Sequence, residues 1–330
     1  MKNIVTVDSG VKGADGENIK YSYDSEMKIK SSNDSIAYYM NQIGAIEAKI
    51  YPKKYGTIVF YDLIPVVTTD PEYADTYTYF CYDGVTLGKF LGSNAKDLPE
   101  STITLKESTA RMYYGGNNYD YSIDELRKSI AVRLPLDTTK ASMSMRGFQE
   151  HAQKVAFFGD SERGITGLFN NGNVPVSNSA VNWATATGDE IANDISTFMY
   201  SIMENSKNNH KPNILLIPPS RWAFLLRPMS SNSNMTILEY VKTNNPYSAM
   251  TNSELTIKQV FQLDEAGTGG VPRMMAYELN EDNLTMRMPI SWRALAPQPV
   301  GLGINVPCEY KFGGVVYRFP LSAAYRDFTA

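Results

Sequence analysis

The side chains that most often carry catalysis or bind metals are few in this sequence. Its 330 residues include two histidines and two cysteines, and none of the four lies within four residues of another. Zinc sites place their ligands in closely spaced pairs, so neither His151 nor Cys81 and Cys308 form a recognisable metal motif. A histidine on the flank of a helix, as we expect for His151, is typically solvated or hydrogen-bonded.

One group of charged residues surrounds a serine. Asp160, Glu162 and Arg163 flank Ser161, which suggests an activated nucleophile at first sight. The same residues at the end of a helix are typical of a capped and salt-bridged helix exit, and we favour that interpretation.

A second acidic group lies earlier in the chain, at Asp62, Asp70, Glu72 and Asp75. Carboxylates at this density can bind calcium, but the spacing does not match that of an EF-hand loop. We interpret this group as a solvated acidic edge.

Other motifs of enzymes are incomplete. The sequence has neither a Gly-x-Ser-x-Gly nucleophile elbow nor a phosphate-binding loop that ends in Gly-Lys-Ser/Thr. The segment from Gly301 to Val306 lacks the third glycine of a dinucleotide fingerprint, and we expect a bend there. Asn33, Asn234 and Asn283 lie in glycosylation sequons, which matter only in a secreted protein. We therefore expect no catalytic, cofactor-binding or metal-binding residue.

Composition points to packing and contact surfaces rather than to chemistry. The chain has 22 tyrosines and 15 methionines, and 43% of its residues are hydrophobic, which is enough for substantial cores. Its formal charge of -4 argues against a protein that grips nucleic acid through a basic face. Two distant cysteines are typical of buried thiols in a reducing compartment, and no segment resembles a signal peptide or a membrane span, so we expect a cytoplasmic protein.

A long helix over residues 121–160 is the element around which the chain is organised. Ser122 and Glu125 fit a capping box that starts it, and Pro135 interrupts it because proline removes a backbone donor. Asp137 can cap the restart, and Gly159 supplies a left-handed stop. The helix seam predicted beyond Asp137 consists of apolar residues at alternating gaps of four and three: Ala141, Met145, Phe148, Ala152 and Val155.

The residues before this helix divide into an arm and a β segment. Residues 1–33 are too polar to form a core alone, so we expect an arm that orders only against a partner, followed by an amphipathic helix that ends before Pro52. Strands are predicted at residues 57–61, 76–82 and 102–105, with a polar tip at 85–101. A thin protruding hairpin and an ordinary β subdomain packed on the main body are both compatible with this pattern.

Residues 165–280 alternate helices with a buried strand, which predicts a compact α/β layer. A second capping box, Thr187 to Glu190, starts a helix, and residues 213–218 form a strand covered on both faces. Ser220 is predicted to cap a short helix, Thr236 to Glu239 form a third capping box, and residues 255–263 are strand-like.

The C-terminal part returns to a period of two. Alternating apolar residues over 284–290 and 302–312 predict antiparallel strands, and Gly313 with Gly314 predicts a tight hairpin into residues 315–321. We expect this sheet to close the fold beneath the seam of the long helix, with the α/β layer as a separate lobe. The predicted class is α+β.

Several segments resemble the tailed-bacteriophage major capsid proteins with the Hong Kong 97-like fold. In the first half of the chain they are Tyr121-Ser-Ile-Asp-Glu-Leu-Arg127, Leu136-Asp-Thr138, Ala156-Phe-Phe-Gly-Asp160 and Gly164-Ile-Thr-Gly-Leu-Phe-Asn170. Near the end they are Met288-Pro-Ile-Ser-Trp-Arg-Ala-Leu-Ala-Pro297 and Gly313-Gly-Val-Val-Tyr-Arg-Phe-Pro-Leu321. The resemblance is distinctive over residues 121–170 and 288–325, roughly a quarter of the chain.

This resemblance implies a division of the chain into five parts. Residues 1–54 would be an N-terminal arm with its amphipathic helix, 55–115 an extended β loop, and 116–164 the spine helix of the peripheral domain. Residues 165–283 would form the axial domain, and 284–330 the C-terminal strands of the peripheral domain.

The function that it implies is structural. Such a protein self-assembles as pentamers and hexamers into an icosahedral virion shell around double-stranded DNA, with portal, scaffold or decoration proteins as further partners and no membrane. No removal of an N-terminal extension is expected. Some relatives cross-link Lys to Asn between subunits, and Lys89 is a possible donor in the loop, but no motif in the sequence supports such a cross-link. The alternatives are an encapsulin-like nanocompartment shell, an enzyme with a site in residues 165–283, and a monomeric binding module such as an adhesin.

Overall fold

The computed structural model describes residues 4–12, 18–24, 56–83, 104–125, 127, 136–230 and 234–328. The chain divides into two compact units. One consists of Met1–Tyr55 with Tyr121–Thr139, and the other of Gly56–Asp120 with Lys140–Ala330.

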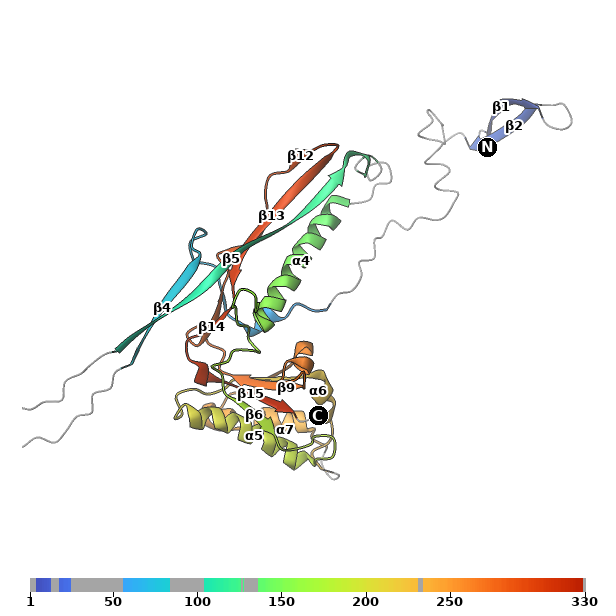
Figure 1. The fold of residues 1–330 in the computed structure, drawn as a ribbon. Coiled ribbons are helices and arrows are strands. Elements are labelled where there is room, and N and C mark those ends of the chain that lie inside the picture. Colours follow the sequence, from blue (N-terminus) through green and yellow to red (C-terminus); the bar gives the residue numbers. More distant parts are fainter. Residues whose placement is uncertain are drawn as a thin grey trace, which may run out of the picture. The chain divides into compact units, whose positions relative to one another are not determined.

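The first unit contains an antiparallel hairpin of β1 (Ile4–Lys12) and β2 (Asn18–Asp24) (Figure 1). It also contains one half of the capping box predicted at Ser122, the bond from the Ser122 N–H to Glu125, while the Ser122 hydroxyl is bonded to the second residue of the turn rather than the third. The Ser122 N–H donates to Glu125 Oε2 at 3.2 Å, and the Ser122 hydroxyl accepts from the Asp124 N–H at 3.3 Å. The amphipathic helix predicted before Pro52, and most of the helical segment predicted before Pro135, lie outside the described residues.

Helix α4 (Leu136–Phe158) begins directly after Pro135, the residue predicted to interrupt the long helix. The predicted seam is buried in its second half, where Phe148, Ala152 and Val155 are at most 5% exposed. Met145 is 44% exposed, because the helix contacts the sheet there through polar groups. Asn117 Nδ2, for example, donates to the Ser144 carbonyl at 2.7 Å.

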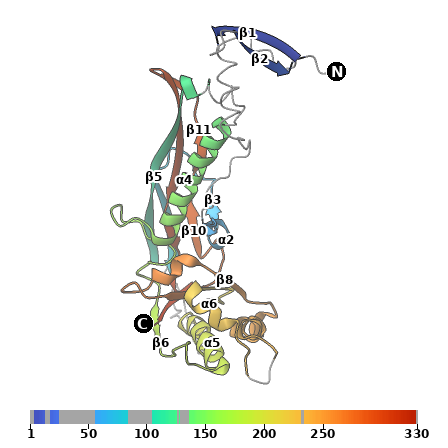
Figure 2. The ribbon, with the colours of Figure 1, turned by 90° about the vertical axis from the view of Figure 1, so that its right-hand side faces the viewer.

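The helix lies alongside a five-stranded sheet with the order β11 (Ile290–Ala294), β13 (Gly303–Gly313), β5 (Thr104–Ser122) and β4 (Thr76–Asp83), and with β12 (Gln298–Val300) paired to β13 (Figures 1 and 2). Of the strand predicted at 102–105, Thr104 and Leu105 are the start of β5, and residues 102 and 103 lie outside the described residues. The strand continues through Gly115, where a glycine is needed because a Cβ would lie 2.4 Å from the ring of Tyr310. This glycine lets Tyr310 lie between β5 and Phe148 of α4, whose ring centroid is 5.0 Å away.

The strand predicted at 57–61 is wrong. Residues 60–63 form the short helix α2 (Phe60–Leu63), in which Phe60 and Leu63 are both fully buried. A spacing of three places both side chains on one face of a helical turn, whereas a strand would turn them to opposite faces. The chain then forms β3 (Val66–Val67), which pairs in parallel with β10 (Leu284–Arg287).

The predicted hairpin at Gly313 and Gly314 is also wrong. The strand that follows, β14 (Val315–Tyr317), pairs with β10 rather than with β13, and neither glycine has a positive φ. Their role is close packing, because a Cβ on Gly314 would lie 2.2 Å from Ile165 Cγ2 and one on Gly313 would lie 2.9 Å from the Arg111 carbonyl oxygen.

Residues 176–277 form the predicted α/β lobe. Its sheet contains β6 (Val176–Ser179), β9 (Arg273–Tyr277), β7 (Ile214–Ile217) and β8 (Thr256–Gln259). Helix α5 (Gly188–Asn205) starts at a complete capping box of Thr187 and Glu190. The remaining helices of the lobe are α6 (Pro219–Leu225), α7 (Ile237–Thr243), α8 (Pro246–Thr251) and the 3₁₀ helix η1 (Phe261–Glu265).

Two details of the lobe differ from the prediction. Pro218, not Ser220, is the N-cap of α6, and no side chain caps it. The strand predicted at 255–263 ends at Gln259 because η1 follows. Thr236 caps α7 as predicted, since its hydroxyl accepts from the Glu239 N–H at 3.2 Å.

The last strand corrects the predicted closing sheet. After the 3₁₀ helix η2 (Pro320–Ser322), strand β15 (Ala323–Phe328) enters the lobe and lies between β6 and β9 (Figure 1). All six of its residues are buried. Their side chains alternate between two apolar clusters: Ala323 and Tyr325 pack with the end of α4, whereas Ala324 and Phe328 pack with α5. The predicted domain boundary at residue 283 therefore does not separate the sheet of the lobe from the sheet beside α4, because β15 belongs to the lobe.

Candidate assembly surface on the β4–β5 hairpin

Strands β4 and β5 form an antiparallel hairpin whose two faces differ in chemistry. The register pairs Tyr79 with Ser108 and Tyr82 with Leu105, and directly paired residues share a face of the sheet. One face therefore carries Tyr77 and Tyr79, and the other carries Phe80, Tyr82 and Leu105 after the paired threonines 78 and 109.

The face with Tyr77 and Tyr79 is fixed to the rest of the unit by arginines. The guanidinium of Arg287 lies 3.9 Å from the centroid of the Tyr77 ring, and that of Arg318 lies 6.0 Å from the centroid of Tyr79. Arg318 also donates to the Tyr77 hydroxyl at 3.1 Å. Cation–π contacts and a hydrogen bond therefore orient this face inward.

The acidic residues before β4 hold the base of the hairpin. Arg287 pairs with Asp70 at 3.2 Å, Arg293 with Glu72 at 2.8 Å, and Lys311 with Asp75 at 2.6 Å. The prediction of a solvated acidic edge is wrong for Asp70, which is 16% exposed, but holds for Glu72 and Asp75, which are 57% and 84% exposed. The sequence did not reveal their basic partners, which are more than 200 residues away in the chain. Asp62 lies 3.9 Å from Lys258.

Arg293 links two strands through carboxylates. Its Nε donates to Glu309 Oε1 at 2.5 Å, while its two terminal nitrogens contact Glu72. Glu309 also accepts a hydrogen bond from the Tyr114 hydroxyl at 2.5 Å. The hydroxyl of Tyr114 and the guanidinium of Arg293 stabilise the ionised form of Glu309 and hold the pKa of this carboxyl below its ordinary value.

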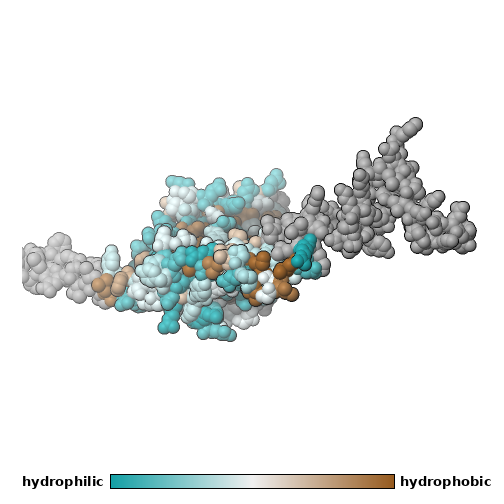
Figure 3. Space-filling view, turned by 90° about the horizontal axis from the view of Figure 1, so that it is seen from above, coloured by the Kyte–Doolittle hydropathy of each residue, from teal (hydrophilic) through white to brown (hydrophobic). Residues whose placement is uncertain are grey.

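The opposite face of the hairpin is exposed and carries three large apolar side chains, with Glu107 paired to Phe80 among them. Phe80 is 63% exposed, Tyr82 77% and Leu105 67%. Figure 3 shows brown, hydrophobic residues beside the grey segment on its left, where the hairpin ends. Large apolar side chains gathered on one exposed face of a protein typically mark a contact surface.

Sequence reasoning predicted strands here but did not single out these three residues. The signal was available, because the segment Thr76-Tyr-Thr-Tyr-Phe-Cys-Tyr82 places aromatic residues at both odd and even positions. A strand with one buried face alternates apolar and polar residues, so aromatics on both faces indicate a second partner.

A second exposed apolar group lies at the β12–β13 turn. Leu295 is 40% exposed, Val300 60% and Leu302 85%, and Gly301 between the last two has a φ of +57°. This turn is the bend that the sequence predicted at Gly301.

The remaining candidate residues occupy structural positions. Asp160 pairs with Arg163 and accepts the Glu162 N–H at 3.1 Å, which confirms the salt-bridged helix exit around Ser161. His151 Nδ1 lies 3.0 Å from the Tyr310 hydroxyl. Burial, together with the positive charges of Arg163 and Lys154, lowers the pKa of His151 despite the opposing charge of Asp160.

The two cysteines are free thiols. Cys308 is buried, as expected, and burial raises the pKa of its thiol against the opposing hydrogen bond from Ser144. Cys81 on β4 is partly exposed, so the expectation of burial fails for it.

A cavity of about 440 Å³ lies between the hairpin and β14. Tyr79, Ala110, Arg163 and Val316 are among its lining residues. In the described part of the chain, no three histidine, cysteine or acidic side chains are grouped closely enough to hold a metal ion. No helix within the described ranges is long and apolar enough to span a membrane.

Comparisons with known proteins agree with this architecture. The chain is similar to a protein in the capsid of Myoviridae phage XM1, with 16% identity and a TM-score of 0.75 over 88% of this chain and 98% of that one. A chain from Mycobacterium phage Bobi gives 11% identity and a TM-score of 0.59 over 87% and 95% of the two chains. A chain from the capsid of an empty GTA particle gives 14% and 0.57 over 89% and 98%.

At these identities the structural matches establish the fold, which is the Hong Kong 97-like fold. A search of curated proteins gives no match. The family model described as "Major capsid protein" matches residues 88–328, most of the chain. This protein therefore belongs to the major capsid protein family and is a shell protein of a phage capsid.

Proposed function

We propose that the chain assembles through heterologous contacts into pentamers and hexamers, and that these close an icosahedral shell around double-stranded DNA. The observation that carries the proposal is the exposed apolar face of Phe80, Tyr82 and Leu105 on a hairpin whose other face is held by Arg287 and Arg318. A contact surface on a fixed base can engage a neighbouring copy without first ordering its own backbone.

The parts of the chain then take different roles. Residues 1–54 serve as the arm and 55–115 as the extended loop that reaches a neighbouring subunit. Residues 116–164, with the strands that follow residue 284, form the peripheral domain. The axial domain comprises residues 165–283 together with β15, which completes the sheet of the lobe.

The energy of assembly comes from repetition. Burying one large apolar side chain contributes roughly 1.5–3 kcal/mol, so the face of Phe80, Tyr82 and Leu105 supplies a contact of modest strength. In a closed shell every protomer gives and receives this contact, and the sum over the shell makes the assembly stable.

The shell protein acts without catalysing a reaction, and it is assembled in the cytoplasm of the bacterial host. Its formal charge of -4 suits a wall that encloses DNA non-specifically without binding it tightly. Portal, scaffold or decoration proteins are its further partners.

Substitution of the exposed face tests the proposal. The triple variant Phe80→Ser, Tyr82→Ser, Leu105→Ser should fold with an unchanged melting temperature but form no shells under negative-stain microscopy. Phe261→Ser is the matched control, because Phe261 is 76% exposed on the lobe and away from the hairpin. Shells of normal yield from the triple variant would contradict the role of this face.

Deletion of residues 85–99 provides an independent test. The shortened chain should keep its helical circular dichroism and remain unassembled. The contents of purified wild-type particles separate the proposal from an encapsulin-like shell: nuclease-protected DNA supports a capsid, whereas an enclosed enzyme and no DNA would support the nanocompartment.

A further inference from the structure

Two segments of chain cross between the lobe and the sheets beside α4, and they are hydrogen-bonded to each other. Residues 278–283 lead from β9 to β10, and residues 318–322 lead from β14 to β15. The Glu278 N–H donates to the Ser322 carbonyl at 3.0 Å, and the Arg318 N–H donates to the Asn283 carbonyl at 2.8 Å. The two crossings therefore form one junction.

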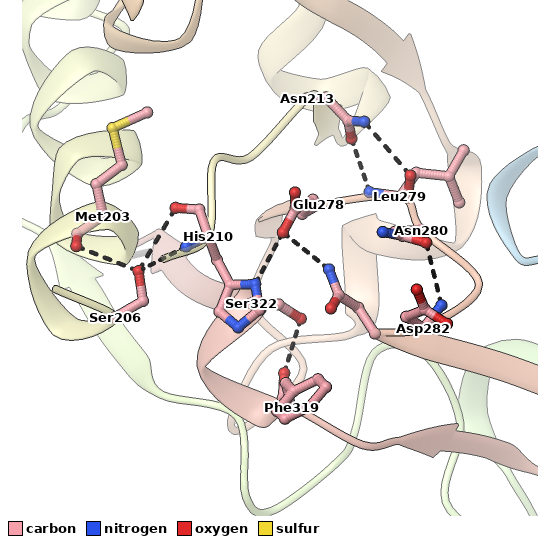
Figure 4. Close-up of polar contacts among 11 residues, drawn as sticks. Met203, Ser206, His210, Asn213, Glu278, Leu279, Asn280, Asp282, Phe319 and Ser322 are labelled. Atoms are coloured by element: carbon pink, nitrogen blue, oxygen red, sulfur yellow. Dashed lines mark hydrogen bonds and ion pairs between the residues drawn. The ribbon is translucent and has the colours of Figure 1, made fainter. Parts of the chain in front are cut away.

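The carboxylate of Glu278 lies at the centre of this junction. Its Oε2 accepts from His210 Nδ1 at 2.8 Å and from Asn283 Nδ2 at 2.8 Å. His210 follows α5, and its backbone N–H donates to the hydroxyl of Ser206 at 3.2 Å. This bond joins the end of α5 to the junction (Figure 4). One carboxylate oxygen thus connects the helical layer of the lobe with Asn283, the residue directly before β10.

A neighbouring contact strengthens the same region. The side-chain amide of Asn213, just before β7, accepts from the Leu279 N–H at 2.7 Å and donates to the Leu279 carbonyl at 3.4 Å (Figure 4). The first crossing is therefore held at two successive residues, Glu278 and Leu279.

The other end of β9 is held by a second polar group. Arg273 donates to Asp327 and, through a terminal nitrogen, to the Phe169 carbonyl at 2.6 Å. The side chains of Arg273 and Asp327 are 6% and 4% exposed, whereas those of His210 and Glu278 are 18% and 25% exposed. The Arg273 end is closed to water, and the Glu278 end is accessible to it.

Between these two ends the contact is apolar. Met275 and Tyr277 of β9 pack in the same cluster as Phe157 of α4 and Leu168. Burial of apolar surface is non-directional, so such a layer tolerates small shear movements, whereas hydrogen bonds at its ends fix one orientation. A cavity of about 350 Å³ lined by His210, Phe319 and Leu321 leaves room for movement at the Glu278 end.

We infer that Glu278, held by His210 and Asn283, is a positioning residue that fixes the orientation of the lobe relative to α4 and thereby the curvature of the shell. The buried Arg273–Asp327 end acts as the pivot, and the more accessible Glu278 end is where the orientation adjusts. This inference rests on the proposed assembly into a closed shell with five-fold and six-fold environments. In such a shell, copies of the same chain hold the lobe at closely related orientations relative to α4.

The test compares Glu278→Gln with Glu281→Gln, an exposed acid on the same crossing. Both changes remove one negative charge, but only the first alters the junction. We expect Glu278→Gln particles to show a distribution of diameters at least twice as wide as that of wild type in electron micrographs, with Glu281→Gln unchanged. His210→Asn should produce the same broadening, and the double variant should add little, since both changes disrupt one group.

A purely structural role would lower the melting temperature and leave the particle diameters unchanged, and that outcome would overturn the inference. A second measurement uses the unassembled protein. Spin labels on Lys154→Cys in α4 and Thr243→Cys in α7, in a Cys81→Ser background, report the distance distribution between α4 and the lobe. Glu278→Gln should broaden it, and an unaltered distribution would equally overturn the inference. Absence of shells from the wild-type chain would instead contradict the proposed function, and the spin-label result would still decide the role of Glu278.

Discussion

Arg273 and Asp327 form a buried, bidentate ion pair between neighbouring strands. Arg273 Nε lies 2.6 Å from Asp327 Oδ1, and a terminal guanidinium nitrogen lies 3.0 Å from Oδ2. The two residues are direct partners in the antiparallel register of β9 and β15. The pair therefore specifies which residues of the last strand face β9, because a shift by one residue would leave both charges buried and unpaired.

Loss of the carboxylate at this pair should be strongly destabilising. Asp327→Asn leaves the Arg273 guanidinium buried without its counter-charge, which typically costs about 3–5 kcal/mol. Urea denaturation of the unassembled protein measures the change, with Asp282→Asn at an exposed turn as the control. A loss below about 1 kcal/mol would mean that water or another acceptor replaces Asp327.

The same carboxylate should give the protein an acid-sensitive component of stability. Burial alone would raise the pKa of Asp327, but the hydrogen bonds from Arg273 and from the Thr268 N–H outweigh it and lower the pKa below the ordinary value. A lowered folded-state pKa contributes stability above the unfolded value of about 4, and this stability is lost as the pH falls through the folded pKa. Stability curves below pH 4 should be shallower for Asp327→Asn than for wild type.

Gly159 and Gly164 allow the cost of close packing to be separated from that of backbone conformation. Their φ values are +67° and +65°, but a Cβ on Gly159 would lie 2.1 Å from the Ile165 carbonyl oxygen, whereas one on Gly164 meets nothing within 4 Å. Gly164→Ala should cost about 1 kcal/mol for the left-handed conformation alone. Gly159→Ala should cost about 3 kcal/mol or more by chemical denaturation, and equal costs would show that the turn relaxes freely.

Burial should decide which ion pair matters at the base of the hairpin. Asp70 and Arg287 are 16% and 12% exposed, whereas Glu72 and Arg293 are 57% and 47% exposed although their contact is shorter. Asp70→Asn should destabilise by about 1–3 kcal/mol, because it weakens a charged contact of a poorly hydrated guanidinium. Glu72→Gln should leave the melting temperature nearly unchanged. The reverse order would show that contact geometry outweighs burial here.

His151 should add a small component of stability that depends on pH near neutrality. Burial is the main cause of its lowered pKa, so the folded state disfavours the protonated ring. Stability should therefore fall as the pH drops through the unfolded value of about 6.5 towards the folded pKa. His151→Gln should flatten thermal stability between pH 7 and pH 5, and a parallel decline in both proteins would exclude His151 as the cause.

The sequence alone determined the elements whose signals are local. The box of Thr187 and Glu190 identified the start of α5, and the apolar run of residues 214–217 identified the buried strand β7. Both signals depend on residues a few positions apart, so local backbone hydrogen bonding and side-chain spacing are sufficient to predict these two elements. The resemblance in residues 121–170 and 288–325 likewise identified the family, which the family model over residues 88–328 then established.

Only the tertiary structure decided the features that depend on residues far apart in the chain. The place of β15 depends on the ion pairs of Arg326 with Asp194 and of Asp327 with Arg273. The acidic residues 70–75 hold the base of the hairpin only because Arg287, Arg293 and Lys311 pair with them. Gly115 looks like a strand breaker until the ring of Tyr310 occupies the space beside it. In each case the deciding partner lies more than 50 residues away, and local sequence carries no information about which distant group will neutralise a charge or fill a space.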